Sequence, residues 1–241
     1  MNAIESAQLQ NYYSDKSSTH ITGGIGQWCS KPSHKVYRAK QTLYSQGDTF
    51  QGLFQLRSGA AKSVIHSKHG EALITEFLFP GDIAGLDGFN QCRYTQTVSF
   101  IQTSSIVFLN QSKTNQLLAT SDPFRQRVLE SLTSKLIHEQ HLLLESNSCK
   151  SEQRFARFIL EMSETFKQRS CSATEFCLPM SRTDIANYLG MALETLSRLL
   201  CKFQCDAVLQ VDKRMVEITN VDKLKQKAGL LFSSNKKNAY Q

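Results

Sequence analysis

The chain has 241 residues, is 40% hydrophobic and carries a formal net charge of +7. This length predicts two domains with cores large enough to fold without disulfides. There is no apolar run of about 18 residues and no basic-then-apolar leader, so we expect no membrane segment and a cytoplasmic location.

The N-terminal segment, residues 1–28, shows no periodicity and is expected to be a mobile tail. After it, glycines recur almost evenly at Gly47, Gly59, Gly70 and Gly81, and short β-rich runs stand between them. These runs are LFQL, AKSVIHS, ALITEFLF and, later, TVSFIQTSSIVFL. The pattern predicts an antiparallel β-roll over residues 29–120, a fold that often encloses a small-molecule pocket.

A long helix is predicted over residues 121–148, opening at Asp122 and Pro123. Its apolar stripe fits either packing against the roll or the seam of a two-stranded dimer. The dimer interpretation places Val128, Leu132, Leu136, Glu139 and Leu143 at the interface. His138 and His141 lie near the end of this seam, where surface histidines are favoured over a pH sensor.

The C-terminal part, residues 149–232, is predicted to be a winged helix-turn-helix. A helix with Phe155 and Phe158 at helical spacing leads into MSRTDIANYLGMALETLSRLLCKF, which reads as two short helices joined at Gly190. Ser181, with Asp184 three residues later, supplies the N-cap of the first helix. The second helix turns Leu196, Leu199, Leu200 and Phe203 inward.

Three polar residues share the outward face of that second helix: Glu194, Ser197 and Arg198. Arginine pairs with guanine, glutamate accepts from the cytosine amino group, and a serine hydroxyl serves either role. The alternative is an ordinary surface ion pair between Glu194 and Arg198, worth about 0.3–0.5 kcal/mol. The preceding helix, the glycine turn and the following hairpin favour DNA reading.

The hairpin spans Leu209 to Ile218 and carries Asp212, Lys213 and Arg214 at its tip. A basic tip would contact phosphates, although a solvated turn fits the pattern as well. Residues 150–241 hold 15 Lys/Arg against 10 Asp/Glu, so the basic excess follows this part of the chain. The last residues, 233–241, again look like a mobile tail.

Seven cysteines occur, without a CxxC pair or a zinc-like His/Cys spacing, and most are expected to be small buried side chains. Cys201 and Cys205 lie one helical turn apart, which leaves a redox or metal pair open, although an S–S bond would strain the helix. GxSxG, GxxxxGK[ST] and HExxH motifs are absent, so an enzyme is not expected.

The order of roll, long helix and winged helix-turn-helix resembles the CRP/FNR family of bacterial transcription regulators, in particular its FNR branch, over about Lys40 to Leu230. Its most specific stretches are SRTDIANYLGMALETLSRLL, GDIAGLDGF and RFARFILEMSETFKQR. The resemblance implies an α+β fold: an N-terminal antiparallel β-roll of the cyclic-nucleotide-binding type, a long dimerisation helix and a C-terminal winged helix-turn-helix.

The family also implies a homodimer that binds a promoter palindrome of the TTGAT-N4-ATCAA type and contacts RNA polymerase, for which the loop from Leu86 to Thr95 is a candidate. Glu194, Ser197 and Arg198 match the residues that read the half-site. The residues expected at the DNA backbone are Ser181, Arg182, Thr195, Lys202, Lys213 and Arg214.

Two effector sites of the family do not match. FNR regulators that sense oxygen hold a [4Fe-4S] cluster on four cysteines, whereas this chain has only Cys29 near its N-terminus and Val107 at the roll position. The cyclic-AMP branch uses a Glu and an Arg-Ser pair, which fall on Leu86 and near Thr95 and Gln96. Arg93 is close to that pair but would need a shifted loop. We therefore expect neither the cluster nor a cyclic nucleotide.

A second hypothesis is a small-molecule or haem-binding sensor that acts through protein contacts with a weakened DNA unit. Its axial ligand would be one of His66, His69, Cys92 or Cys29.

The DNA unit departs from the family at three positions. Ala192 replaces the hydroxyl residue that usually caps the recognition helix, and Ala207 and Lys213 replace glycines. These changes predict weaker DNA binding, partly offset by the charge of Lys213.

Overall fold

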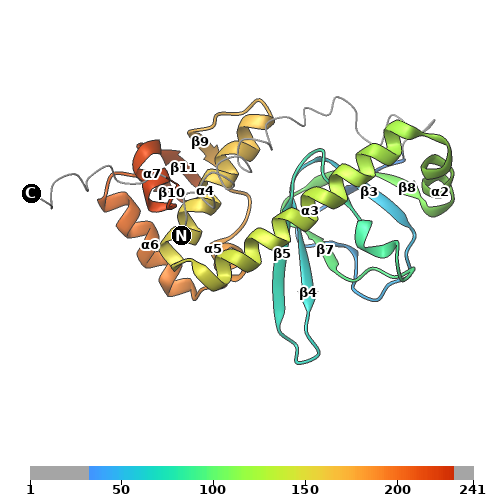
Figure 1. Ribbon diagram of the computed structural model, residues 1–241, viewed down its shortest axis with the longest axis horizontal. Coiled ribbons are helices and arrows are strands. Elements are labelled where there is room, and N and C mark those ends of the chain that lie inside the picture. The colour runs from blue at the N-terminus through green and yellow to red at the C-terminus, as the bar shows by residue number, and fades with distance from the viewer. Residues whose placement is uncertain (1–32, 231–241) are drawn as a thin grey trace, which may run out of the picture. The chain divides into compact units, whose positions relative to one another are not determined.

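The computed structural model describes residues 33–230 (Figure 1). The predicted tails, residues 1–28 and 233–241, and Cys29 lie outside this range. The chain divides into two compact units, which we call the roll unit, up to Leu143, and the C-terminal unit, from Leu144 onward. The functional boundaries drawn above at residues 28, 120 and 148 stay predictions.

The roll unit contains two antiparallel four-stranded sheets, ordered β1-β8-β3-β6 and β2-β7-β4-β5. The strands are β1 (Ser33–Tyr37), β2 (Thr42–Tyr44), β3 (Gly52–Ser58), β4 (Ala61–His66), β5 (Ala72–Leu78), β6 (Ile83–Ala84), β7 (Thr97–Phe100) and β8 (Ser104–Asn110). Strands β4 and β5 form the long hairpin seen in Figure 1. The predicted antiparallel roll is confirmed, and every β-rich run named above forms a strand.

The core of the roll is aliphatic and aromatic. Leu53, Ile106 and Leu109 are fully buried, and the rings of Tyr44 and Tyr94 stack with their centroids 3.8 Å apart. Strand alternation accounts for this arrangement, because successive side chains point to opposite faces of a sheet and one face of each strand meets the other sheet.

Two helices follow the roll strands: α2 (Gln111–Thr120), which was not predicted, and α3 (Asp122–Ser148), which begins at Asp122 as predicted. The Asn110 side chain caps α2 by accepting from the amide of Lys113 at 2.9 Å. Phe124 and Val128 of α3 are buried in the roll's own core. Placing Val128 at a dimer seam was therefore wrong, since its side chain has no surface left for a partner.

The C-terminal unit consists of α4 (Ser151–Gln168), β9 (Glu175–Cys177), α5 (Arg182–Tyr188), α6 (Leu193–Cys205), β10 (Leu209–Asp212), β11 (Met215–Ile218) and α7 (Val221–Lys227). Its three strands form one antiparallel sheet in the order β10-β11-β9. The two short helices on either side of Gly190 and the hairpin after them are confirmed, whereas β9 and α7 were not predicted. An edge-on contact between Phe155 of α4 and Phe203 of α6, at 5.1 Å, joins the helices.

A buried ion pair ties three helices of this unit together. Nη1 of Arg157 on α4 lies 3.2 Å from Oε1 of Glu145 at the end of α3, and its Nε donates to the carbonyl of Ala228 beyond α7 at 2.9 Å. Burial raises the pKa of Glu145 by more than Arg157 lowers it. The pair holds the last turn of α3 to its neighbours.

Within residues 33–230, no helix is long and apolar enough to cross a membrane.

Candidate nucleic-acid interface

The first helix of the pair, α5, begins with a complete capping box. The hydroxyl of Ser181 accepts from the amide of Asp184 at 3.1 Å, and the Asp184 carboxylate accepts from the Ser181 amide at 3.2 Å. Two orphan amides of the helix terminus are thereby satisfied within four residues of sequence. Arg182, the first residue of α5, is exposed.

The turn after α5 depends on Gly190, whose φ of +59° lies in the left-handed region. Arg154 of α4 secures this turn, because its Nε donates to the carbonyl of Leu189 at 3.1 Å and its Nη2 to the carbonyl of Gly190 at 3.3 Å. Arg154 was not predicted at this site, since no local pattern links it to a turn 35 residues away.

Helix α6 has one buried and one exposed face. Leu196, Leu200 and Phe203 are buried, while Glu194 and Arg198 are exposed. Within residues 33–230 Glu194 and Arg198 form no ion pair with each other, so the alternative of a surface pair does not hold. Both charged groups are available to a partner.

Ser197 and Thr195 make local contacts on the same helix. The Ser197 hydroxyl donates to the carbonyl of Leu193 at 2.9 Å, which leaves its oxygen free to accept. Thr195 Oγ1 accepts from Nη2 of Arg198 at 3.5 Å, the outer limit of a hydrogen bond. Neither contact turns Arg198 away from the exposed face.

The start of α6 lacks a side-chain cap. Ala192 makes no capping hydrogen bond, as its side chain predicts. Uncapped amides at a helix N-terminus point outward and, with the helix dipole, favour a negative group. The same substitution that costs helix stability therefore leaves room for a phosphate oxygen.

Both cations at the tip of the β10–β11 hairpin, Lys213 and Arg214, are exposed, but they differ in their contacts. Lys213 is exposed and adopts a φ of +54°, the left-handed conformation expected where the family has glycine. Nη1 of Arg214 instead donates to the carbonyl of Pro179 at 2.9 Å, which ties the hairpin to the segment before α5. Ala207 after α6 likewise has a φ of +50°. Arg214 thus has a structural bond besides any role at the DNA backbone.

Lys202, expected at the DNA backbone, lies in an intramolecular ion network. Its Nζ is 2.7 Å from Oε2 of Glu152, whose Oε1 is 2.7 Å from Nζ of Lys227, and Lys227 also pairs with Asp206 at 2.7 Å. Hydrogen bonds from Lys202 and Lys227 lower the pKa of Glu152. A phosphate would have to compete with Glu152 for Lys202.

The expectation that most cysteines are buried was wrong. Of the six in the described range, only Cys149 is buried, and burial raises the pKa of its thiol. Cys201 and Cys205 are exposed free thiols on α6. No cluster of three or more His, Cys, Asp or Glu that could hold a metal ion lies within residues 33–230.

Apolar side chains are exposed along α3. Leu136 and Leu143 expose 56% and 65% of their surfaces, and Leu132 exposes 38%. Glu139 is exposed beside them. These leucines recur at helical spacing and form an exposed apolar stripe along α3.

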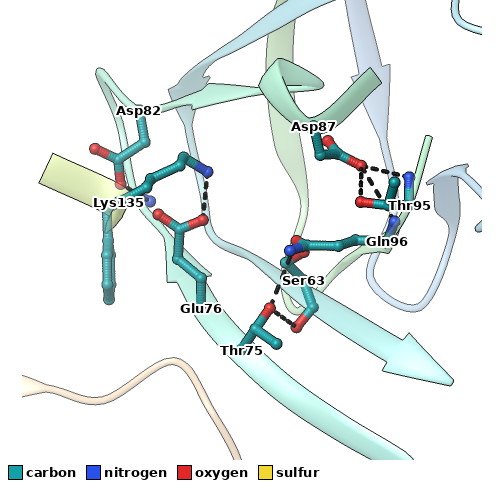
Figure 2. A network of polar contacts seen from close by, with 9 residues as sticks. Ser63, Thr75, Glu76, Asp82, Asp87, Thr95, Gln96 and Lys135 are labelled. Atoms are coloured by element: carbon teal, nitrogen blue, oxygen red, sulfur yellow. Dashed lines mark hydrogen bonds and ion pairs between the residues drawn. The ribbon is translucent and has the colours of Figure 1, made fainter. Parts of the chain in front are cut away.

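Polar side chains inside the roll bond to one another (Figure 2). Nζ of Lys135 on α3 lies 2.5 Å from Oε2 of Glu76 on β5, and the Gln96 side-chain oxygen accepts from the Ser63 hydroxyl. Burial lowers the pKa of Lys135, but pairing with Glu76 outweighs it, so that the pKa is raised. Asp87 accepts from Thr95 and Gln96.

Two family models match the chain. The Cyclic nucleotide-binding domain matches residues 34–121, and the Crp-like helix-turn-helix domain matches residues 153–227. The first covers the roll and the second covers α5, α6 and the hairpin.

Two bacterial regulators are similar to the chain over most of its length. The chain is 34% identical over 195 residues to the Fumarate and nitrate reduction regulatory protein of Escherichia coli K12, covering 81% of this chain and 78% of that protein. It is 32% identical to the Anaerobic regulatory protein of Haemophilus influenzae, covering 81% and 76%.

Among solved structures, FixK2 from Bradyrhizobium japonicum has the same fold, with a TM-score of 0.75 at 24% identity, covering 81% of this chain and 96% of that one. The family consists of transcription regulators and not of enzymes. With its roll, its long helix and its DNA-binding helix-turn-helix, the chain belongs to the CRP/FNR family of transcription regulators.

Proposed function

We propose that this protein binds, as a dimer, an FNR-like palindrome of the TTGAT-N4-ATCAA type and does so without a [4Fe-4S] cluster or cyclic AMP. The observation that carries the proposal is the exposed face of α6, on which Glu194 and Arg198 do not form an ion pair with each other. A helix with a buried apolar face and an unpaired polar face suits the major groove. Ser197 supplies the third polar group of this face.

Contacts to the DNA backbone come from groups around α6. The uncapped amides after Ala192 and the exposed side chains of Arg182 and Lys213 are the main candidates. Thr195 adds a hydroxyl contact, whereas Ser181 contributes only after its hydroxyl stops donating to the Asp184 carboxylate at 2.7 Å, and Lys202 only after leaving Glu152. Arg214 would reach a phosphate with the donors that Pro179 leaves unused.

Dimerisation is assigned to α3. Leu132, Leu136 and Leu143, flanked by Glu139, form the exposed stripe that a second copy would cover. A two-fold dimer also matches the symmetry of a palindrome, which is what a single recognition helix per subunit needs.

The residues present do not fit an iron-sulfur cluster in the roll. Val107, at the position of the roll cysteine, has an exposed fraction of 0% and supplies no thiolate. The alternative of a haem sensor gains no support either, because His66 and His69 are exposed on the β4–β5 hairpin and Cys92 is exposed in a loop. These environments differ from the apolar pocket that holds a haem.

RNA polymerase is the second proposed partner. In the loop from Leu86 to Thr95, the buried residues Leu86, Gly88 and Tyr94 anchor an exposed stretch over residues 90–93. Substituting that stretch should abolish activation in a transcription assay while DNA affinity stays unchanged. Loss of both together would assign the loop a structural role instead.

The DNA proposal is tested by fluorescence anisotropy in air, at one fixed salt concentration, with labelled TTGAT-N4-ATCAA and scrambled duplexes. Arg198→Ala should weaken binding to the palindrome roughly 5- to 150-fold, because a lost bidentate base contact costs about 1–3 kcal/mol. Lys213→Ala is the matched control and should weaken both duplexes alike. Equal wild-type affinity for both duplexes would contradict the proposal.

A further inference from the structure

One carboxylate oxygen in the roll unit accepts three hydrogen bonds from two consecutive residues. Oδ2 of Asp87 lies 2.7 Å from the amide of Thr95, 3.1 Å from its hydroxyl and 3.1 Å from the amide of Gln96 (Figure 2). Successive backbone amides directed at one point form a concave site for anions, and hydrogen bonds to a charged acceptor are stronger than neutral ones.

The segment that carries Asp87 is held tightly. It is the 3-10 helix η3 (Leu86–Gly88), which follows Gly85 at a φ of +93°. A Cβ at Gly85 would lie 2.9 Å from the carbonyl oxygen of Gly52, and one at Gly88 would lie 2.3 Å from Cδ2 of Phe50. Without these two glycines η3 could not pack this close to the core, so the position of Asp87 is set by packing.

The segment that carries the donors, Thr95 and Gln96, is also fixed by the core. Tyr94, next to Thr95, is buried, and its hydroxyl donates to the carbonyl of Gly52 at 2.9 Å. Its amide donates to the carbonyl of Asp48 at 3.0 Å. Both partners of the carboxylate–amide contact are therefore positioned by the same core.

The other polar groups nearby are also engaged within the chain. Gln96 accepts from Ser63, and Nη1 of Arg93 donates to the carbonyl of Gly47 at 2.7 Å. Glu76 is paired with Lys135. An incoming phosphate would be repelled by the negative charges of Asp87 and Glu76. The amides of Thr95 and Gln96, which could donate to it, already donate to Asp87. A cyclic nucleotide therefore does not fit this roll as it stands.

We propose that the Asp87 carboxylate is the resident anion of the Thr95–Gln96 amide site and takes the place that an anionic effector would occupy. The roll then needs no phosphate or cyclic nucleotide from solution to complete this site. The inference rests on the part of the proposed function that dispenses with cyclic AMP, but it does not depend on which DNA sequence the protein reads.

The test is anion rescue of the full-length Asp87→Ala protein. Removing the carboxylate should lower the Tm by roughly 3–10 °C, because three charge-assisted hydrogen bonds, from the amide and hydroxyl of Thr95 and the amide of Gln96, are lost. Formate, which fits the vacated volume, should restore part of this loss relative to chloride at equal ionic strength. The wild type should show no such difference.

Asp48→Ala is the matched control. Asp48 is another roll carboxylate, but it accepts from a single amide, that of Ser45 at 2.8 Å. The decrease in Tm of Asp48→Ala should be smaller than that of Asp87→Ala, and formate should not reverse it. An Asp87→Ala protein that responds to formate no more than Asp48→Ala does would overturn the proposal.

A second arm covers the case in which Asp87→Ala fails to fold. Asp87→Asn keeps the shape and one acceptor oxygen, so it should fold, melt below the wild type and not respond to formate, because the amide still fills the site. Calorimetric titration of the wild type with cyclic AMP and with inorganic phosphate should show no binding to the roll. Binding of either that is unchanged in Asp87→Asn would show that the anion site lies elsewhere and would overturn the assignment.

Discussion

The polar side chains of the roll and those on the outer face of α6 are of similar kinds but have opposite surroundings. In the roll, Asp87 and the Glu76–Lys135 pair are matched within the chain. On α6, Glu194 and Arg198 are exposed and not paired with each other. Matched polar groups hold a fold together, whereas unmatched exposed ones are available for recognition. The comparison assigns a structural role to the first set and a binding role to the second.

The largest effect is expected where a matched pair is fully buried. Arg157→Ala should lower the free energy of unfolding by about 3–5 kcal/mol, because Glu145 would be left as a buried charge without its partner. Urea unfolding followed by circular dichroism measures it. The double variant Glu145→Gln, Arg157→Met should recover much of the loss. If Arg157→Ala were as stable as the wild type, the ion pair between Arg157 and Glu145 would not contribute to the stability of the fold.

The half-buried pair of the roll should give an intermediate effect. Lys135→Met alone should cost about 1–2 kcal/mol, because Glu76 loses its ammonium partner at 2.5 Å. In a double-mutant cycle with Glu76→Gln, the two losses should be less than additive. Fully additive losses would mean that the two side chains act independently.

A smaller effect, of opposite sign, is expected for DNA affinity when Glu152 is changed. Glu152→Gln weakens the hold on Lys202 and removes a negative charge, so binding should become a few times tighter at low salt. The slope of log affinity against log salt should steepen by about 1 as Lys202 reaches a phosphate. Glu164→Gln, at another glutamate of α4, is the control and should leave the slope unchanged.

The smallest effect is a pH dependence that separates Glu152 from Glu145. Folding lowers the pKa of Glu152 from its ordinary 4.5, so its stabilisation should be complete above about pH 5 and should fade as the pH falls below 4.5. Folding raises the pKa of Glu145, so its ionisation should cost stability as the pH rises through the raised value. Unfolding free energies of Glu152→Gln and Glu145→Gln against pH should therefore differ from the wild type in opposite directions.

Local signals account for the parts that could be predicted from the sequence. The capping box of Ser181 and Asp184, the turn at Gly190 and the hairpin after α6 depend on residues a few positions apart. The short helix α7 was missed although Asn220 caps it, because its seven residues have no second periodic helix beside them in the sequence, as α5 has in α6. Strand β6 has two residues, too few to show any alternation.

The sequence by itself determined the order of roll, long helix and winged helix-turn-helix and the two faces of α6, since these follow from the spacing of apolar residues along the chain. The tertiary structure decided which partner each polar group takes. Lys202 meets Glu152 from 50 residues away, Arg157 meets the carbonyl of Ala228 from 71 residues away, and Val128 turns into the roll's core. Such pairings arise only when packing brings distant segments together, so no local period or spacing in the chain encodes them.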